Sequence, residues 1–191
     1  IEKHSDEYYS VGYPEGWFVD KEGSFINSTV TDKVKDLEIG ETFAEVITSG
    51  DHDITSFTIG GGRCVATLQT ISMATELFEV NLTDGSLTQI SGVNQEIYDN
   101  VKMGEVQKRW VRTTDGKQML VWVTLPPNFD PAKKYPTLLY CQGGPQSVVS
   151  QSWSYRWNFQ LMAAQGYVVV SPNRRGLPSF GQEWLDQISG D

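Results

Sequence analysis

Two continuous apolar runs separated by a helical pattern place the strongest constraint on the fold of this chain. Residues 137–141 and 167–171 are apolar without alternation, as in strands that are covered on both faces. Between them, from about 152 to 165, apolar side chains recur three or four residues apart, which is typical of a helix that ends at Gly166. Strand, helix, strand in this order is a βαβ unit and predicts a parallel sheet. A further helix is expected to begin near Gln182.

The tryptophans of this half are expected to pack in the core. Trp153 and Trp157 are four residues apart on the predicted helix, and at that spacing a core position is more common than a pocket. Trp110 and Trp122 lie on the two strands of a hairpin predicted over 110–125, and we expect them to pack beneath it.

The loop between the first apolar strand and the helix reads Gln142-Gly143-Gly144-Pro145. Ligand sites in open α/β sheets lie outside the carboxyl ends of the strands, where this loop falls. In α/β-hydrolases the corresponding loop supplies one donor of the oxyanion hole, and glycine lets the backbone come close to a substrate. A turn that only joins strand to helix would carry the same local sequence, so both readings stay open from these residues alone.

The first half of the chain reads as short strands separated by glycine turns. Hairpins are predicted over 17–30, 54–70 and 76–90, and the last has an Asp-Gly turn. Phe18, Gly23 and Phe25 match Phe57, Gly62 and Cys64 at an offset of 39 residues. A repeat of about 40 residues with four strands is the size of a β-propeller blade, and 54–92 would be one complete blade. Two blades cannot close a propeller, since ~4–8 are usual, so the other blades are expected outside this chain.

The charge distribution separates the two halves. The net charge is −9, but residues 1–106 are strongly acidic, whereas 107–191 carry a small positive balance. We therefore predict two units with different surfaces, both of them incomplete. The acidic half would repel phosphates and the basic pairs of the second half are sparse, which argues against nucleic acid as a partner. No apolar run approaches the ~20 residues that span a bilayer, which argues against a membrane partner.

Cysteines and histidines give no sign of a metal site. Cys64 and Cys141 lie in apolar strand patterns and are expected to be buried free thiols. His4 and His52 lie in polar segments and are expected to be solvated, with too few ligands near either one for a metal. No metal or organic cofactor is predicted.

No serine in the chain has the surroundings of a hydrolase nucleophile. That nucleophile lies in Gly-x-Ser-x-Gly, on a sharp turn between strand and helix. Ser179 is the nearest candidate, but Leu177 occupies the position two residues before it where glycine is required. Ser179 is therefore predicted to be an ordinary loop residue.

Several short motifs occur through the second half of the chain: LPPNFD at 125–130, KYP at 134–136, QGGP at 142–145, YVVV at 167–170 and NRRG at 173–176. Together they resemble the prolyl oligopeptidase family of serine peptidases, and look most like its bacterial dipeptidyl-peptidases near the acylaminoacyl-peptidase branch. The resemblance is specific from about residue 120 onward and looser before it.

The resemblance implies a mixed fold: all-β propeller blades over 1–106, followed over 107–191 by the first part of an α/β-hydrolase domain. It implies an oxyanion-hole loop at Gln142, Gly143 and Gly144. Many relatives have Tyr or His where this chain has Gln142, so the donor is either the Gln142 amide or the backbone N–H of Gly143 or Gly144. We favour the backbone, because of the glycine pair.

The resemblance also implies what the chain lacks and what the parent does. All three triad residues would lie outside these 191 residues, so this chain alone is expected to be inactive. The parent would cleave short N-terminal pieces, dipeptides above all, from peptide substrates. It would need the remainder of its chain for a complete fold, and a homodimer is compatible with the family. Bacterial relatives favour an extracytoplasmic, often periplasmic, setting, with a cytoplasmic one also open.

Three alternatives remain at this stage. Arg174 and Arg175 follow the second strand and would either bind a substrate carboxylate or carbonyl, or form structural ion pairs. The parent could instead be an esterase of the same fold, although a propeller repeat is unusual for esterases. The chain could also be a non-catalytic interaction module, although unclosed blades would leave exposed strand edges.

Overall fold

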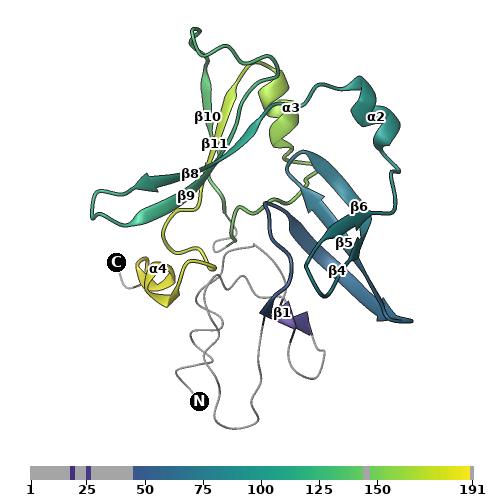
Figure 1. The fold of residues 1–191 in the computed structure, drawn as a ribbon. Helices are drawn as coiled ribbons and strands as arrows, with labels where there is room; N and C mark the ends of the chain where they lie inside the picture. The colour runs from purple at the N-terminus through teal and green to yellow at the C-terminus, as the bar shows by residue number, and fades with distance from the viewer. Residues whose placement is uncertain (1–17, 20–24, 27–44, 144–146, 190–191) are drawn as a thin grey trace.

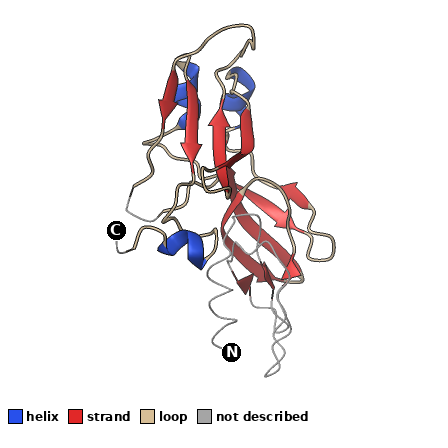
Figure 2. Ribbon diagram, turned by 90° about the vertical axis from the view of Figure 1, so that its left-hand side faces the viewer, coloured by secondary structure: helices blue, strands red, loops and turns tan. Residues whose placement is uncertain are grey.

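The computed structural model describes residues 18–19, 25–26, 45–143 and 147–189, and contains both strands and helices. Most strands belong to two four-stranded sheets that form separate groups in Figure 1. Figures 1 and 2 both show α4 well apart from α2 and α3, on the side where the chain ends.

The first sheet is antiparallel and follows the predicted hairpins. Its strands are β4 (Asp53–Gly60), β5 (Arg63–Thr70), β6 (Met73–Val80) and β7 (Leu87–Gln89), hydrogen-bonded in that order. This sheet confirms the hairpins predicted over 54–70 and 76–90.

Gly85 shows why a glycine is needed in the β6–β7 turn. Its φ is +71°, a conformation that L side chains rarely adopt, and its N–H donates to the carbonyl of Asn81 at 2.8 Å. A Cβ at this position would collide with the backbone carbonyl of Ile47. This glycine is therefore required by the fold itself.

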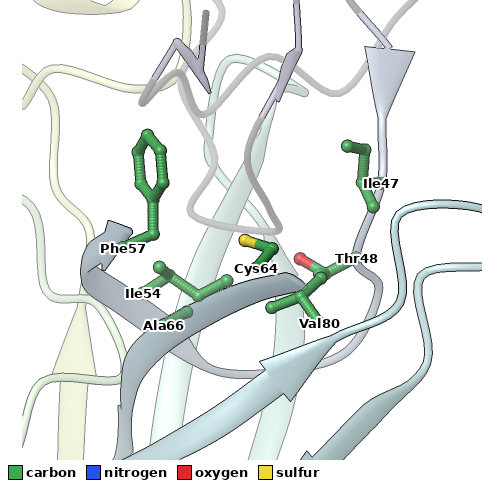
Figure 3. Close-up of a pocket in the computed structure, with 7 residues that line it drawn as sticks. All are labelled: Ile47, Thr48, Ile54, Phe57, Cys64, Ala66 and Val80. Atoms are coloured by element: carbon green, nitrogen blue, oxygen red, sulfur yellow. The ribbon is translucent and has the colours of Figure 1, made fainter. Parts of the chain in front are cut away.

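One face of the first sheet carries its own apolar core. Alternate residues of β5 point to this face, and Cys64, Ala66 and Leu68 are all at least 97% buried. A shallow apolar hollow lies on the same face (Figure 3). Its lining residues are Ile47, Thr48, Ile54, Phe57, Cys64, Ala66 and Val80. Cys64 is a buried free thiol as expected, whereas Cys141 is exposed, because it lies in the loop just beyond its strand.

A third, small sheet is formed by two-residue strands near the start of the chain. Its strands are β1 (Phe18–Val19), β2 (Phe25–Ile26) and β3 (Glu45–Val46), in the order β2-β1-β3. The antiparallel pairing of Phe18 with Ile26 confirms the centre of the predicted first hairpin. The rest of that hairpin, and His4, lie outside the described residues.

A short helix that the sequence analysis did not anticipate, α2 (Gln95–Asn100), leads from the first sheet to the second. The second sheet contains β8 (Val106–Arg112), β9 (Gln118–Thr124), β10 (Thr137–Leu139) and β11 (Val168–Pro172).

The second sheet has the predicted βαβ unit. Its strand order is β10-β11-β9-β8, and β10 and β11 are parallel, with Leu138 opposite Val169. The helix between them is α3 (Phe159–Ala164). Its Phe159 and Ala163 pack with residues of β9 and β11 into one core; the buried members of that core are Ile71, Leu120, Trp122, Val149, Phe159, Ala163 and Val169.

The helix is shorter than predicted because polar side chains stop it from starting earlier. The Ser154 hydroxyl accepts the N–H of Trp157 at 2.9 Å, and the Asn158 side chain accepts the N–H of Leu161 at 3.0 Å as an N-cap. The helix therefore begins at Phe159 and ends, as predicted, before Gly166.

Two of the four tryptophans are not in the core, against expectation. Trp157 is 51% exposed because it lies before the helix, and Trp110 is 51% exposed on the outer strand β8, where it meets Phe180 edge-on. Trp153 is half-buried against Tyr98, and Trp122 is buried as predicted.

Strand β10 is not covered on both faces as the sequence suggested. Leu138 is 37% and Leu139 is 63% exposed, and β10 is also an edge strand, paired only with β11. The other predicted elements of this half are present: the 110–125 hairpin as β8 and β9, and the last helix as α4 (Gln182–Asp186). None of the helices in the described part of the chain is long and apolar enough to cross a membrane.

Candidate active-site loop

The glycine-containing loop lies at the carboxyl ends of the two parallel strands. The N–H of Tyr140 still bonds to the carbonyl of Val170 at 2.8 Å, and the chain leaves the sheet at Cys141. Gln142 and Gly143 follow as irregular backbone, whereas Gly144 lies outside the described residues. Asn173 and Arg174 follow directly after β11, and Arg174 contacts Gln142. The two parallel strands therefore end at one site, as in open α/β sheets.

The backbone of Gln142 and Gly143 has donors that the described residues do not use. No described residue accepts a hydrogen bond from either N–H, although the Gln142 carbonyl accepts from Arg174 Nη2 at a long 3.4 Å. A Cβ added to Gly143 would meet nothing within 4 Å. Neither packing nor φ therefore requires glycine here, in contrast to Gly85.

The segment that follows the loop is held at Val149 by Asn173, which the sequence showed only as the first residue of the NRRG motif and not as a site residue. Its Oδ1 accepts the N–H of Val149 at 2.8 Å, and its Nδ2 donates to the carbonyl of Val149 at 3.0 Å. The Asn173 side chain is fully buried, so these bonds are shielded from water. A polar residue directly after an apolar strand was the available signal, but its partner 24 residues away was not visible in the sequence.

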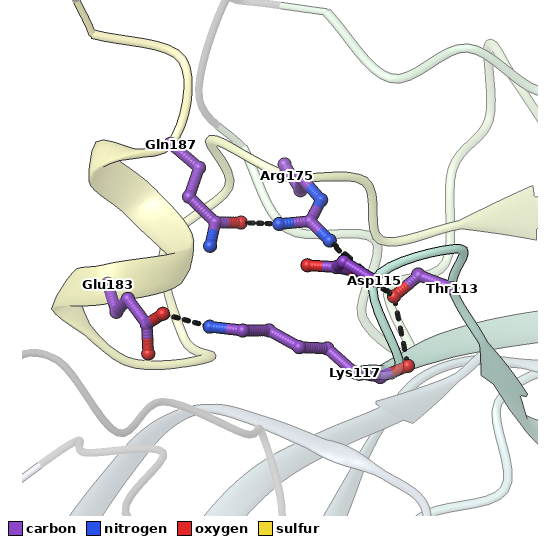
Figure 4. A network of polar contacts seen from close by, with 6 residues as sticks. All are labelled: Thr113, Asp115, Lys117, Arg175, Glu183 and Gln187. Atoms are coloured by element: carbon purple, nitrogen blue, oxygen red, sulfur yellow. Dashed lines mark hydrogen bonds and ion pairs between the residues drawn. The ribbon is translucent and has the colours of Figure 1, made fainter.

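The two arginines after β11 have different surroundings. Arg174 contacts the loop, as described, and its Nη1 donates to the carbonyl of Arg175 at 2.9 Å. Arg175 instead forms an ion pair with Asp115 and a hydrogen bond with Gln187 (Figure 4). Its guanidinium also stacks on the ring of Trp184, 5.0 Å from the ring centre. These contacts favour the structural alternative for Arg175.

The network around Arg175 attaches α4 to the β8–β9 turn. The Thr113 hydroxyl and Arg175 together lower the pKa of Asp115 to about 2. Lys117 forms a second ion pair with Glu183 of α4 (Figure 4). Both connections run from the β8–β9 turn to α4. They therefore fix the position of α4, and we assign Arg175 no role in binding a ligand.

The remaining candidates do not form a second site. Ser179 has a φ of +84° and lies late in the long loop that joins β11 to α4, not on a sharp turn directly after a strand. His52 was expected to be solvated but is only 6% exposed, because it packs beside Thr48; burial lowers its pKa, with Asp51 opposing the shift. Within the described ranges, no group of His, Cys, Asp or Glu could hold a metal ion. The apolar hollow of Figure 3 is on the first sheet and not at the loop.

Comparisons with known proteins agree on one family. The model of the prolyl oligopeptidase family matches residues 153–191. The chain is 49% identical over 145 residues to dipeptidyl-peptidase 5 from Porphyromonas gingivalis, covering 76% of this chain and 21% of that protein. It is 48% identical to dipeptidyl-peptidase 5 from Porphyromonas endodontalis, with the same coverage of both chains.

A solved structure shares the fold over most of the described residues. Acylaminoacyl peptidase from Pyrococcus horikoshii superposes with a TM-score of 0.65 at 25% identity, covering 78% of this chain and 23% of that one. This chain thus spans about a fifth of the length of the curated relatives it matches, 21% in each case.

Proposed function

Because this chain belongs to the prolyl oligopeptidase family, we propose that its parent is a serine exopeptidase that releases dipeptides from the N-termini of oligopeptides. The relatives named dipeptidyl-peptidase 5 support a dipeptide as the product released from the N-terminus. The full reaction needs residues beyond this chain, which carries one part of the active site.

On this proposal the two sheets belong to two domains. The first, with β4 to β7, is a blade of a β-propeller within residues 1–106, because four antiparallel strands in about 40 residues form such a blade. The second, with the parallel pair β10 and β11, is the start of an α/β-hydrolase domain over 107–191. Strand β10 has an unpaired edge and two exposed leucines, which supports pairing and packing with further chain there in the parent.

The oxyanion-hole loop is formed by Gln142, Gly143 and Gly144. The single observation that carries this assignment is that the N–H groups of Gln142 and Gly143 follow a parallel strand and bond to no described residue. Donors of this kind stabilise the negative oxygen that forms when a carbonyl is attacked, and loss of one slows such reactions by roughly 10²–10³-fold.

The reaction would follow the serine-peptidase scheme, with this loop in one role. A serine outside the chain attacks the scissile carbonyl, a histidine takes the serine proton and passes it to the leaving amine, and an aspartate orients that histidine. The loop holds the resulting oxyanion. The propeller would admit small, unstructured peptides, and no step requires a metal or organic cofactor.

Activity of the parent on matched substrates tests the proposal. We expect hydrolysis of dipeptidyl chromogenic amides with a free N-terminus, loss of that activity when the N-terminus is acetylated, and weaker turnover of p-nitrophenyl esters. Hydrolysis of the esters alone would instead indicate an acyl hydrolase. Equal cleavage of blocked and free amides would overturn the dipeptidyl assignment.

The 191-residue chain provides the complementary test. It should neither turn over the same amides nor react with a fluorophosphonate probe, because the proposed nucleophile lies elsewhere in the parent. Labelling of Ser179 by the probe would contradict the assignment of the triad outside this chain.

A further inference from the structure

Asp53, the first residue of β4, reaches from the first sheet to the segment that follows the candidate loop. Its Oδ2 accepts the Ser150 hydroxyl at 2.5 Å, and its Oδ1 accepts the N–H of Gln151 at 3.1 Å. Burial raises the pKa of Asp53, and hydrogen bonds from Ser150, from Gln151 and, on its own sheet, from the Gln69 side chain oppose the rise. The carboxylate is thus half-buried and paired with residues almost 100 positions away.

A second contact joins the same two parts of the molecule. The side chain of Gln151 is 4% exposed, and its Oε1 accepts the N–H of Ile71 at 3.2 Å, in the turn between β5 and β6. Ile71 itself packs into the core of the second sheet. The first sheet therefore bonds to both the backbone N–H and the side chain of Gln151.

The segment held by Asp53 adjoins the far end of the loop. Val149, one residue before Ser150, is paired in both directions with Asn173. Arg174, which follows Asn173 in the sequence, contacts the carbonyl of Gln142 at the start of the loop. Two consecutive residues after β11 thus contact the chain before and after the loop's undescribed residues, Arg174 at Gln142 and Asn173 at Val149, and Asp53 holds the two residues that follow Val149.

We propose that Asp53 is a positioning residue that couples the first sheet to the oxyanion-hole loop, so that contact between the two domains holds the loop in its catalytic geometry. This inference rests on the proposed function. Donors in such a site must be held within about 0.5 Å of their productive positions, which is why residues that do not touch substrate affect the rate. Asp53 acts through Ser150, Gln151 and Val149 and does not contact the reacting atoms.

Two substitutions separate the geometry of Asp53 from its charge. In Asp53→Asn, Oδ1 can still accept from Gln151 and Nδ2 can donate to the Ser150 hydroxyl, so the connection survives without the charge. In Asp53→Ala, Ser150 and Gln151 lose their partner, and so does the Gln69 side chain within the first sheet. Thr55→Ala is the matched control, because Thr55 lies on the same strand and its hydroxyl bonds within the first sheet, to Thr67 at 2.8 Å.

The experiment measures kcat and KM of the full-length parent on a dipeptidyl chromogenic amide, with the thermal midpoint of each variant. We expect Asp53→Ala to lower kcat about 10-fold or more with KM little changed, because a displaced donor acts mainly in the transition state. Asp53→Asn and Thr55→Ala should stay within about twofold of wild type in kcat. Should Asp53→Ala fail to fold, Ser150→Ala, which removes one of the two contacts, is expected to lower kcat in the same selective way.

Four outcomes would count against the proposal. A variant that loses thermal stability but keeps kcat would show that Asp53 only stabilises the domain contact. A rise in KM alone would place its effect on substrate binding rather than on the loop. If the wild-type parent does not hydrolyse dipeptidyl amides, the proposed function fails and this inference fails with it. If the wild type is active and Asp53→Ala has the same kcat, this inference alone fails.

Discussion

Gly85 and Gly143 occupy similar places, each in a loop that follows a β-strand, but the structure requires glycine at only one of them. Gly85 has a φ of +71°, and a Cβ there would collide with the Ile47 backbone. Gly143 has no such φ, and a Cβ there would meet nothing within 4 Å. The comparison separates a glycine explained by folding from one that folding leaves unexplained, and the second lies where the proposed chemistry needs close access to the backbone.

The largest expected effect is on stability, at Gly85. Gly85→Ala should lower the free energy of unfolding by about 2–4 kcal/mol, since it adds a strained φ and a clash with backbone. Thermal unfolding of the parent measures this loss, and activity per folded molecule should not change. A variant as stable as wild type would show that the fold does not require glycine at position 85.

Gly143→Ala should have the opposite profile. We expect an unchanged thermal midpoint and a fall in kcat/KM of about 10- to 100-fold, because the methyl group would occupy space that the substrate needs. Gly60→Ala is the matched control: a Cβ at Gly60 also meets nothing within 4 Å, but Gly60 is on the first sheet, away from the loop. If both variants retain full activity, the loop does not approach the substrate.

A smaller effect is expected in acid, at the network that attaches α4. The pKa of Asp115 is lowered to about 2 by Thr113 and Arg175, so its contribution to stability is present above the ordinary value of 3.8 and is lost as the pH falls toward 2. Asp115→Asn should therefore flatten the pH dependence of unfolding between those two values. Identical pH profiles for variant and wild type would mean that the carboxylate has no part in the attachment.

The smallest effect is expected at the Gln142 side chain. Because we assign the donor to the backbone, Gln142→Ala should leave kcat/KM within about twofold of wild type. A loss of roughly 100-fold in steady-state kinetics would identify the side-chain amide as the donor instead, since that is the effect of deleting one oxyanion contact.

The sequence predicted elements whose causes are local. The hairpins followed from glycine turns between alternating strands, and the parallel pair followed from two apolar runs flanking a helical pattern. The start of α3 was predicted too early. The hydroxyl of Ser154 and the side chain of Asn158 accept backbone N–H groups there, so the helix begins only at Phe159 although the apolar spacing starts before it. Burial of His52 was missed because it depends on packing beside Thr48.

The candidate site divides in the same way. The position of Gln142 and Gly143 at the end of a strand was predictable, because strand and loop adjoin in sequence. The roles of Asn173 and Asp53 were not, since their partners lie 24 and 97 or more residues away. Only the folded arrangement shows that Arg174 faces the loop while Arg175 faces α4.

The central claim is tested most directly by a structure of the parent with a fluorophosphonate bound covalently to its nucleophile. The account predicts that the phosphoryl oxygen lies about 2.7–3.1 Å from a backbone nitrogen of the loop, at Gly143 or Gly144. A phosphoryl oxygen bound elsewhere, with these N–H groups turned to carbonyls of the protein itself, would contradict it.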